Sequence, residues 1–597
     1  MPTRAGAAWF WLRSRPLMLW RGWRNLCAGL RRWPASAALA DAPVLAQLRA
    51  PLWTDGRGDE FALVAGKVQN LRVAARALDG VVVPAGQVLS FWRQVGRPVG
   101  RRGYVPGREV RAGCVIPTIA GGICQLSNTL AACARRAGFE LLERHAHSAR
   151  IEQAAPRDAD ADATVFWNYV DLGIRAAVDW RIDAALTGDE LVLTLRAASA
   201  NAAPEPPQRR PIVPIRVETP PPRQPPVARG CLTCEETGCH LHRPQLRGQG
   251  ARTAWLLDGW TPEFDQWLRA RPGAADRFLP VLPSWLPGRA ARRWLQWPSV
   301  DDDARTLTFF AASLRRAFWQ RLWANSAGKR QASLLSGQRW LAQAYARRLR
   351  PEHTHLVIDQ GLLPCLQALG ALGGRRYEVL ARALPMQEIE RQLDSAQQQG
   401  AARDAGDASL SDFRAGPALM ALEAAAMRGA SGVVTAHAEV ARYWAARGLA
   451  VERLAWRLPA MPDRPKRRAR GGAAPLIVFP ASALARKGFH ELTAALRGMN
   501  ARLRILGAPP PFALALPGVA LEYGRYGDGW LADADVVALP AHVEHNPRAL
   551  LQAIAAGIPV VATPACGVEQ GARLVAAGDV SALRQAIEAA LRGLPQP

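Results

Sequence analysis

Acidic residues are scarce in this chain, and the first forty residues contain none. Of its 597 residues, 76 are Lys or Arg and 50 are Asp or Glu, which gives a formal charge of +26 and a pI of about 11.0. This balance favours anionic partners, namely nucleotide phosphates, acidic lipid surfaces or nucleic acid. Charge does not choose among them, but the motifs below make nucleic acid the weakest of the three.

The N-terminal segment, residues 1–40, lacks a long uncharged apolar run. A membrane-spanning helix needs roughly 18 to 20 apolar residues, so we expect neither a spanning helix nor an export signal, and a cytoplasmic protein. Arg and Trp alternate instead, at Arg4, Trp9, Trp11, Arg13, Arg15, Trp20, Arg21, Trp23, Arg24, Arg31, Arg32 and Trp33. Two interpretations stay open: a helix on the anionic inner face of the plasma membrane, or a helix that packs its Trp side chains on the next domain.

Further absences narrow the chemistry. The nine cysteines are odd in number and follow no secretion signal, which argues against a disulfide framework. Neither a GxGxxG fingerprint nor a Walker loop is present, so two common phosphate-binding loops are excluded. The chain is nevertheless globular, with 49% hydrophobic and 21% charged residues.

The length predicts about three or four folded units. Closely spaced prolines between Ala203 and Ala228 mark the clearest linker. Before it we expect an α+β unit of short strands and turns with one helix. The expected divisions are a basic Trp-rich segment at 1–50, the α+β domain at 51–200, the linker at 201–250, and two further domains at 251–455 and 456–597.

The C-terminal half alternates apolar runs with helical patterns. The runs are residues 253–260, 355–361, 377–385, 431–437, 475–480, 502–507, 519–524, 534–540 and 559–564. This alternation predicts parallel sheets in two doubly wound, Rossmann-like α/β domains. Ligands bind such domains at the carboxyl ends of the strands.

Residues 544–563, EHNPRALLQAIAAGIPVVAT, combine an acid with a helix start. We expect Asn546 to cap a helix that begins at Pro547 and stops at Gly557. Glu544 then lies at the helix mouth, where its carboxylate accepts hydrogen bonds from sugar hydroxyls. In the loop after the first strand of the last domain, Arg486 and Lys487 are placed to neutralise a leaving diphosphate.

These motifs, with ARKGFHEL (485–492) and ADVVALP (534–540), resemble the retaining nucleotide-sugar glycosyltransferases of the B-type fold over residues 251–597. The resemblance implies that Glu544 contacts the donor sugar, that Arg486 and Lys487 contact its diphosphate, and that transfer needs no metal. Gln552 stands where the family has a ribose-binding glutamate. The remaining donor-binding candidates are Asn546, Arg548 and His437, although a lone histidine at a strand end, such as His437, is more often structural.

In the first domain, the glycine turn of GGICQLSNTL (121–130) leads into a helix with Cys124 near its start. A helix dipole there lowers a thiol pKa, and His145 and His147 follow, which suggests Cys/His nucleophilic chemistry. The alternative is a buried structural cysteine. With ERHAHS (143–148) and DATVFWNYVDLGIR (162–175), residues 60–195 resemble the VanW-like domain, which implies a cell-envelope context and no particular reaction.

A compact cluster of metal-ligating residue types follows the proline linker. It has the spacing C-x2-C-x4-C-H-x-H and consists of Cys231, Cys234, Cys239, His240 and His242. Sulfur and imidazole ligands so close together fit a structural zinc site, and an iron–sulfur centre completed by a distant cysteine is the rival. An unligated linker is the third interpretation.

The leading hypothesis is a hexosyltransferase-like enzyme. It passes a sugar from a nucleotide sugar to an envelope glycan or a lipid-linked acceptor, with the VanW-like domain as an accessory. One alternative is a non-catalytic protein that binds envelope glycan with a degenerate transferase fold. The other is peptide or acyl chemistry centred on Cys124.

Overall fold

The structure is a computed structural model, and it forms two compact units. Unit 1 comprises Met1–Arg252 with Leu349–His355 and Gly370–Arg376, and unit 2 comprises the rest. The residues that it describes are 4–53, 60–111, 114–146, 162–198, 250–271, 275–280, 297, 305–323, 327–399, 408–411, 414–460, 474–510, 514–527 and 529–593.

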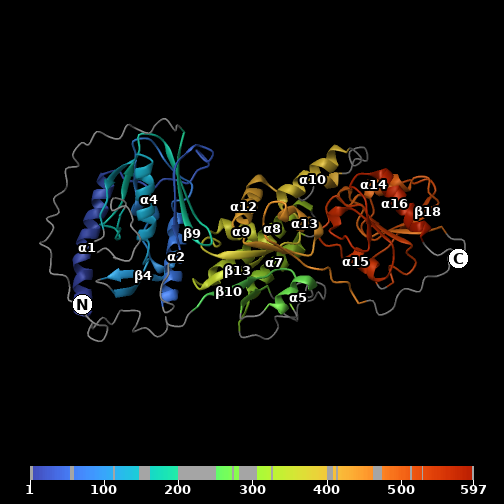
Figure 1. The fold of residues 1–597 in the computed structure, drawn as a ribbon, viewed down its shortest axis with the longest axis horizontal. Coiled ribbons are helices and arrows are strands. Elements are labelled where there is room, and N and C mark those ends of the chain that lie inside the picture. Colours follow the sequence, from blue (N-terminus) through green and yellow to red (C-terminus); the bar gives the residue numbers. More distant parts are fainter. Residues whose placement is uncertain are drawn as a thin grey trace. The chain divides into compact units, whose positions relative to one another are not determined.

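Unit 1 is an α+β domain, as predicted. Its largest sheet is antiparallel and has the order β1 (Val44–Pro51), β9 (Glu190–Ala197), β8 (Trp180–Leu186) and β2 (Val81–Val83). Smaller sheets join β3 (Val88–Ser90), β7 (Gly173–Arg175) and β6 (Glu140–Glu143), and β4 (Pro106–Arg111) with β5 (Cys114–Ile119). Figure 1 shows helices α2 and α4 among these strands.

The expectation of one helix in this domain was wrong. Besides α4 (Cys124–Arg136), the structure has α2 (Phe61–Arg76) and the short α3 (Phe91–Val95). Helix α2 is buried on most of its circumference, so its sequence lacks the polar stripe by which a surface helix is recognised. Its side chains join one core with Leu130 and Trp180.

The N-terminal segment forms helix α1 (Arg4–Cys27), which carries Pro16 in its interior. Trp9, Trp20 and Trp23 are exposed to 60%, 56% and 63%, so they do not pack on the domain. Trp33, beyond the helix, is buried in the core of unit 1. Of these four tryptophans, only Trp33 packs on the next domain as the second interpretation expected.

Unit 2 contains the two Rossmann-like sheets that the alternating pattern predicts. Seven described strands have the order β12 (Thr306–Thr308), β11 (Ala275–Leu279), β10 (Arg252–Leu256), β13 (His353–Asp359), β14 (Arg376–Leu380), β15 (Gly432–Thr435) and β16 (Val451–Arg453). Six more have the order β19 (Val519–Tyr523), β18 (Ala501–Ile505), β17 (Leu476–Phe479), β20 (Val536–Leu539), β21 (Val560–Ala562) and β22 (Ala572–Leu574). The pairings within the second sheet are parallel.

All nine strands expected from apolar runs are present in these sheets. Strands β11, β12, β16 and β22 were not expected, because they are short and carry charged or polar side chains. Strands β12, β16 and β22 lie at sheet edges, where each strand pairs with only one neighbouring strand. Such strands are less enclosed than central strands and therefore need no apolar run. A polar sequence of three to five residues gives no periodic signal.

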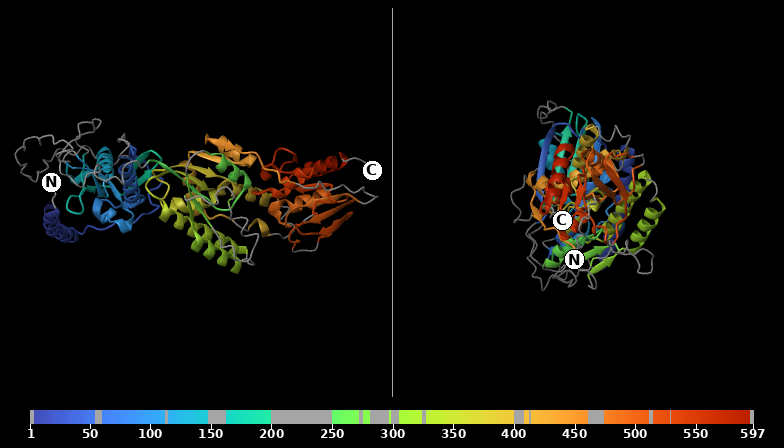
Figure 2. Two further views of the ribbon diagram at one scale, coloured as in Figure 1. Left: turned by 90° about the horizontal axis from the view of Figure 1, so that it is seen from below. Right: turned by 90° about the vertical axis from the view of Figure 1, so that its right-hand side faces the viewer.

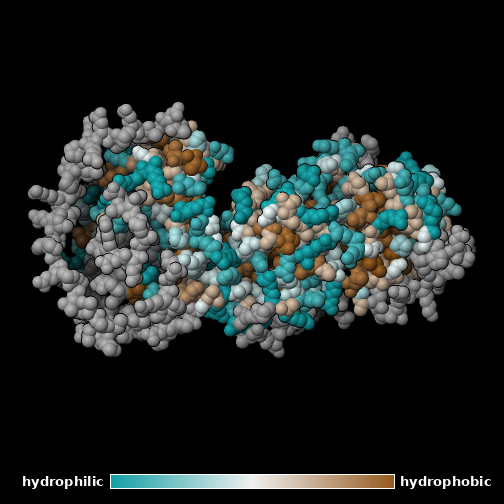
Figure 3. All heavy atoms as spheres, in the orientation of Figure 1, coloured by the Kyte–Doolittle hydropathy of each residue, from teal (hydrophilic) through white to brown (hydrophobic). Residues whose placement is uncertain are grey.

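Helices cover these sheets (Figures 1 and 2). They are α5 (Pro262–Ala270), α7 (Phe310–Leu322), α8 (Ala327–Arg348), α9 (Leu363–Ala368), α10 (Met386–Gln398), α12 (Pro417–Arg428), α13 (Ala438–Ala445), α14 (Phe489–Leu496), α15 (Arg548–Ala555) and α16 (Val580–Arg592). On the face drawn in Figure 3, hydrophobic patches of unit 2 lie among hydrophilic residues. Among the described residues, no helix combines the length and the apolar character that crossing a membrane requires.

Gly488 fixes the loop after β17. It caps the single turn Ala485–Lys487 with φ of 75°, a left-handed conformation that favours glycine. A Cβ atom there would lie 2.0 Å from the carbonyl oxygen of Pro540, at the end of β20. The glycine therefore permits the close approach of two loops at one edge of the sheet.

We predict that Gly488→Ala destabilises the protein by about 2 to 4 kcal/mol, because positive φ and a backbone clash add together. Gly498→Ala is the matched control: its φ is 73°, and nothing lies within 4 Å of the added Cβ. The control should cost only about 1 kcal/mol. Chemical denaturation measures both, and equal costs would contradict the close approach.

Candidate functional site

Two loops of the second sheet of unit 2 meet at its carboxyl edge. Strands β17 and β20 are parallel neighbours, so the segments that follow them lie side by side. The first carries Lys487 and the second carries Glu544. Lys487 Nζ lies 2.9 Å from Glu544 Oε2 and donates to the Val543 carbonyl oxygen at 3.1 Å. The carbonyl oxygen of Arg486 accepts from the His542 amide at 3.0 Å.

Glu544 is an ionised carboxylate in a mostly buried position. Its side chain is 13% exposed, and Oε1 accepts a hydrogen bond from the Asn546 amide at 2.8 Å. Burial alone would raise the pKa of Glu544, but Lys487 and the amide lower it, and the net shift is downward. A fixed negative charge therefore stands at this edge of the sheet.

Glu544 lines a pocket of about 250 Å³. The pocket wall is formed by Pro480, Tyr526, Leu539, Glu544, Asn546, Pro547, Arg548, Ala549, Leu550 and Gln552. Four of the candidates thus surround one space: Glu544, Asn546, Arg548 and Gln552. Arg486, Lys487 and His437 are not part of its lining, and Lys487 reaches it only through Glu544.

The expected capping of the adjoining helix was wrong. Helix α15 begins at Arg548, with Pro547 in the capping position, and no side chain caps it. Asn546 Oδ1 instead accepts a hydrogen bond from Arg548 Nε at 3.1 Å. Gly557 has φ of 71° and follows the helix end, as expected.

Gln552 is paired within the pocket. Its Oε1 accepts a hydrogen bond from Trp530 Nε1 at 3.2 Å, and the Trp530 ring meets the Tyr526 ring edge-on with centroids 5.6 Å apart. The side-chain nitrogen of Gln552 takes no part in this hydrogen bond. Neither aromatic residue was a candidate, because no spacing in the sequence links Trp530 to Gln552.

Arg548 bridges the two Rossmann-like domains of unit 2. Its guanidinium donates to both carboxylate oxygens of Glu263, at 2.8 and 2.5 Å, and Glu263 is buried at the start of α5. Glu263 also accepts from the Arg457 amide at 2.8 Å. A bidentate pair fixes both distance and orientation. The sequence Thr-Pro-Glu at 261–263 is typical of a helix start, but nothing in it indicates that Glu263 pairs with Arg548 of the next domain.

His437 forms a second link between the same domains. Its Nδ1 accepts from the Val440 amide at the start of α13, so Nε2 carries the proton and donates to the Glu544 carbonyl oxygen at 3.0 Å. The ring is 2% exposed, and burial lowers the pKa of His437. The neutral imidazole thus positions the Glu544 loop from the neighbouring domain.

Charged residues also gather at the carboxyl edge of the first sheet of unit 2. Asp258 follows β10 and accepts from Arg316 of α7 at 2.6 Å. Asp359 ends β13 and pairs with Arg382, which follows β14. Burial raises the pKa of Asp359, while Arg382 opposes that shift. Neither Asp258 nor Asp359 was a candidate, although an acid directly after an apolar run is a signal that the sequence contains.

In unit 1, Cys124 begins helix α4, as expected. The glycine turn before it is held by Asn70, whose side-chain nitrogen donates to the carbonyl oxygens of Val105 and Gly121, at 3.0 Å each. The Cys124 sulfur lies 3.8 Å from Thr164 Oγ1. His145 Nε2 instead lies 3.3 Å from Glu143 Oε1, so the described contacts do not join the Cys124 thiol to the His145 ring.

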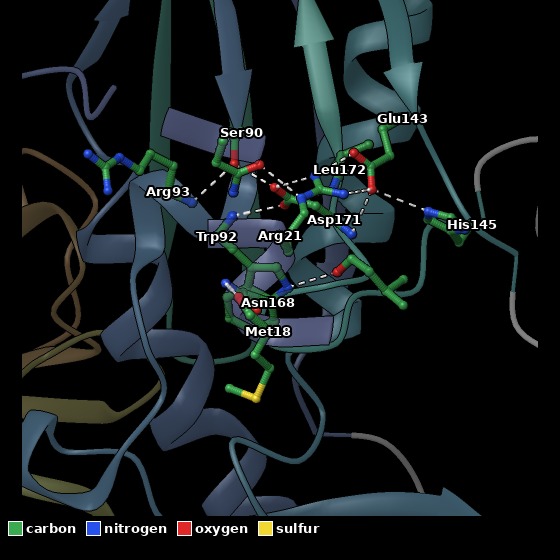
Figure 4. Close-up of polar contacts among 12 residues, drawn as sticks. Met18, Arg21, Ser90, Trp92, Arg93, Glu143, His145, Asn168, Asp171 and Leu172 are labelled. Carbon is green, nitrogen blue, oxygen red and sulfur yellow. Dashed lines mark hydrogen bonds and ion pairs between the residues drawn. The ribbon is translucent and has the colours of Figure 1, made fainter. Parts of the chain in front are cut away.

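Helix α1 is attached to unit 1 through a buried charge cluster (Figure 4). Arg21 donates to both oxygens of Glu143, at 2.8 and 2.5 Å, and lies 3.6 Å from Asp171. Asp171 is 1% exposed and accepts from the Ser90 hydroxyl and the Trp92 amide. Interactions with His145 and Arg21 outweigh burial and lower the pKa of Glu143 to about 2.

His147 and the linker cluster of Cys231, Cys234, Cys239, His240 and His242 lie outside the described residues. Their predicted roles stay predictions. Within the described ranges, no group of three or more His, Cys, Asp or Glu side chains is arranged to hold a metal ion.

Two family models match separate parts of the chain. The family described as VanW like protein matches residues 66–196, and Glycosyl transferases group 1 matches residues 474–593. The chain is 28% identical over 141 residues to the vancomycin B-type resistance protein VanW of Enterococcus faecalis, which covers 23% of this chain and 51% of that protein. It is 30% identical over 128 residues to the uncharacterized protein YoaR of Bacillus subtilis, covering 21% and 41%. The chain thus spans about half or less of these curated relatives.

Several solved structures match part of the chain at low TM-scores. The apo lipopolysaccharide outer core galactosyltransferase WaaB matches with a TM-score of 0.34 at 11% identity, covering 57% of this chain and 90% of that one. Sucrose-phosphate synthase of Thermosynechococcus elongatus matches with a TM-score of 0.35 at 16% identity, with the same two coverages. Anabaena HepE in complex with UDP and glucose gives 0.32 at 15%, again with those coverages.

We predict that Cys124 is alkylated at least about tenfold faster than Cys133, because thiolate fraction and exposure set the rate. Cys133 is fully buried, and burial raises its pKa to about 12. Peptide mapping after timed iodoacetamide treatment measures each rate. Exposed Cys27 is the fast reference and buried Cys566 the slow one. If Cys124 is alkylated as slowly as Cys566, its role is purely structural.

Proposed function

Because a VanW-like domain at residues 66–196 is joined in this chain to a group 1 glycosyltransferase domain at residues 474–593, we propose that the protein is a glycosyltransferase of the cell envelope. It transfers a hexose from a nucleotide sugar to an envelope glycan or a lipid-linked acceptor, with retention at the sugar carbon. The observation that carries the proposal is the ionised Glu544, held by Lys487 at the wall of a pocket in the donor domain.

The proposed roles follow from charge and position. Glu544 accepts hydrogen bonds from hydroxyls of the donor sugar, while Lys487 and Arg486 offset the charge that develops on the leaving diphosphate. Asn546, Arg548 and Gln552 line the space that the donor would fill. His437 acts indirectly, because it holds the backbone of Glu544.

In this proposal the other parts of the chain bind the acceptor and attach the protein to the membrane. Residues 251–455 receive the acceptor, and the VanW-like domain steers it. Helix α1, with three exposed tryptophans and no acid, attaches the protein to the inner face of the plasma membrane. The Cys/His cluster orders the 201–250 linker by binding zinc.

We predict that a nucleotide-sugar donor raises the melting temperature of the native chain, and that Lys487→Ala weakens this binding by about 1 to 3 kcal/mol. The variant also leaves Glu544 buried without its cation, so the pKa of Glu544 rises. The acid limb of donor binding therefore moves to higher pH. Thermal shift across a panel of nucleotide sugars and a pH series measures both effects.

Arg497→Ala is the control for lost positive charge, since Arg497 is exposed in the same domain and does not line the pocket. It should leave donor affinity and its pH dependence unchanged. An unaltered affinity of Lys487→Ala for every nucleoside diphosphate tested would remove the diphosphate role from Lys487.

Gln552 favours a second candidate function, that of a glycan-binding protein which holds a donor without transferring it. An amide loses the charge-assisted increment that a glutamate gives to ribose hydroxyls. We predict that Gln552→Glu tightens donor binding or raises turnover, because the new carboxylate keeps one oxygen for Trp530 and offers the other to the ribose. Gln552→Ala should lower affinity by about 0.5 to 1.5 kcal/mol.

Isothermal titration and a transfer assay measure these effects, with Gln585→Glu as the control that adds the same charge on the exposed side of α16. Activity that appears only in Gln552→Glu would favour the binding protein over the enzyme. If neither change at 552 alters binding, Gln552 has no contact with the donor.

A further inference from the structure

Helix α7 exposes four large apolar side chains at intervals of four residues. Phe310, Leu314, Phe318 and Leu322 are exposed to 43%, 37%, 59% and 59%. Side chains four positions apart share one face of a helix, so they form a single band, here called the α7 stripe. Leu307, on the edge strand β12 just before the helix, is 39% exposed as well.

The other face of α7 is firmly attached to the domain. Ser313 is buried, and the Phe309 ring packs on Tyr345 with centroids 4.6 Å apart. Arg316 reaches Asp258 at the carboxyl edge of the sheet. The stripe is therefore the outward side of an ordered helix and not the inner face of a helix that has failed to pack. Figure 2 shows α7 and α8, in yellow-green, along the outer side of the fold.

Helices α7 and α8 and the segments next to them are rich in positive charge in the sequence, although Asp301, Asp302 and Asp303, which lie outside the described residues, precede them. From Ala304 to Pro351 the sequence contains no Asp or Glu and ten Lys or Arg: Arg305, Arg315, Arg316, Arg321, Lys329, Arg330, Arg339, Arg347, Arg348 and Arg350. Arg315 and Arg321 are exposed on α7 itself, and Arg315 lies over the Trp340 ring of α8 at 4.0 Å. A second copy of this chain would bring the same positive charge against it, which opposes self-association.

We propose that the α7 stripe docks on an anionic lipid bilayer. Apolar side chains enter the boundary between headgroups and acyl chains, and the flanking arginines pair with lipid phosphates. Trp319 and Trp323, whose rings are 4.9 Å apart, belong to the residue type that favours this depth. Arg316 joins α7 to Asp258 at the carboxyl edge of the first sheet of unit 2, the domain proposed to receive the acceptor. Docking of α7 would therefore bring this edge close to the lipid. It does not depend on sugar transfer.

The test is hydrogen exchange of the full chain with vesicles of phosphatidylglycerol or phosphatidylcholine, read peptide by peptide. Residues 309–323 should become protected on phosphatidylglycerol, and the protection should fade as salt rises, because the attraction is largely Coulombic. The local readout separates this surface from α1, whose peptides report their own contact. No protection of 309–323, or equal protection on phosphatidylcholine at high salt, would overturn the proposal.

The paired variants are Leu314→Gln/Phe318→Gln and, as the control, Leu574→Gln/Tyr523→Gln. The control residues are exposed to 37% and 55% on the donor domain, much like the residues they match. The α7 variant should bind phosphatidylglycerol vesicles about ten- to a hundredfold more weakly and lose the protection of 309–323, and the control should do neither. Equal losses in both would also overturn it.

Two further results separate the outcomes. Self-association of the native chain without lipid, abolished by the α7 variant, would overturn the proposal in favour of a second copy. The α7 variant should keep the thermal shift with nucleotide sugars. A chain that docks through α7 but binds no nucleotide sugar would refute the proposed function and leave this inference standing.

Discussion

The ion pair between Lys487 and Glu544 is the interaction on which the pocket at the carboxyl edge of the second sheet of unit 2 depends. It ties the loop after β17 to the loop after β20, and Gly488 lets their backbones approach closely enough for it to form. A largely buried pair contributes little net stability, but removal of one partner leaves an uncompensated charge. The pair therefore acts mainly on geometry, since it fixes where the carboxylate points.

Much of this arrangement follows from the sequence, because parallel sheets bring the ends of apolar strands to a common edge. The central strands and the Glu544 and Lys487 loops were predicted on that basis, whereas the helix start at Cys124 was predicted from the glycine turn before it. Contacts between distant segments were not: Arg548 and Glu263 are 285 residues apart, and no local pattern relates them. Asn546 was assigned as a cap from its residue type, but the nearby guanidinium of Arg548 took its side-chain oxygen.

In both units an arginine side chain attaches a helix to a carboxylate of the domain. Arg21 attaches α1 to unit 1 through Glu143, and Arg316 attaches α7 to the edge of the first sheet through Asp258. In each case the helix keeps large apolar side chains on its outer side. An ion pair with a buried carboxylate fixes the position of a helix without burying the apolar side chains on its outer side. Those side chains can then contact another surface.

The bidentate bond from Arg548 to Glu263 connects the pocket wall to the contact between the two Rossmann-like domains. Both terminal nitrogens of this guanidinium are occupied by one carboxylate, yet Arg548 also forms part of the pocket wall. The same two N–H groups cannot hold Glu263 and a diphosphate at once. A diphosphate that took these two N–H groups would release Glu263, and occupancy of the pocket and separation of the two domains would then be coupled equilibria, with each step changing the free energy of the other.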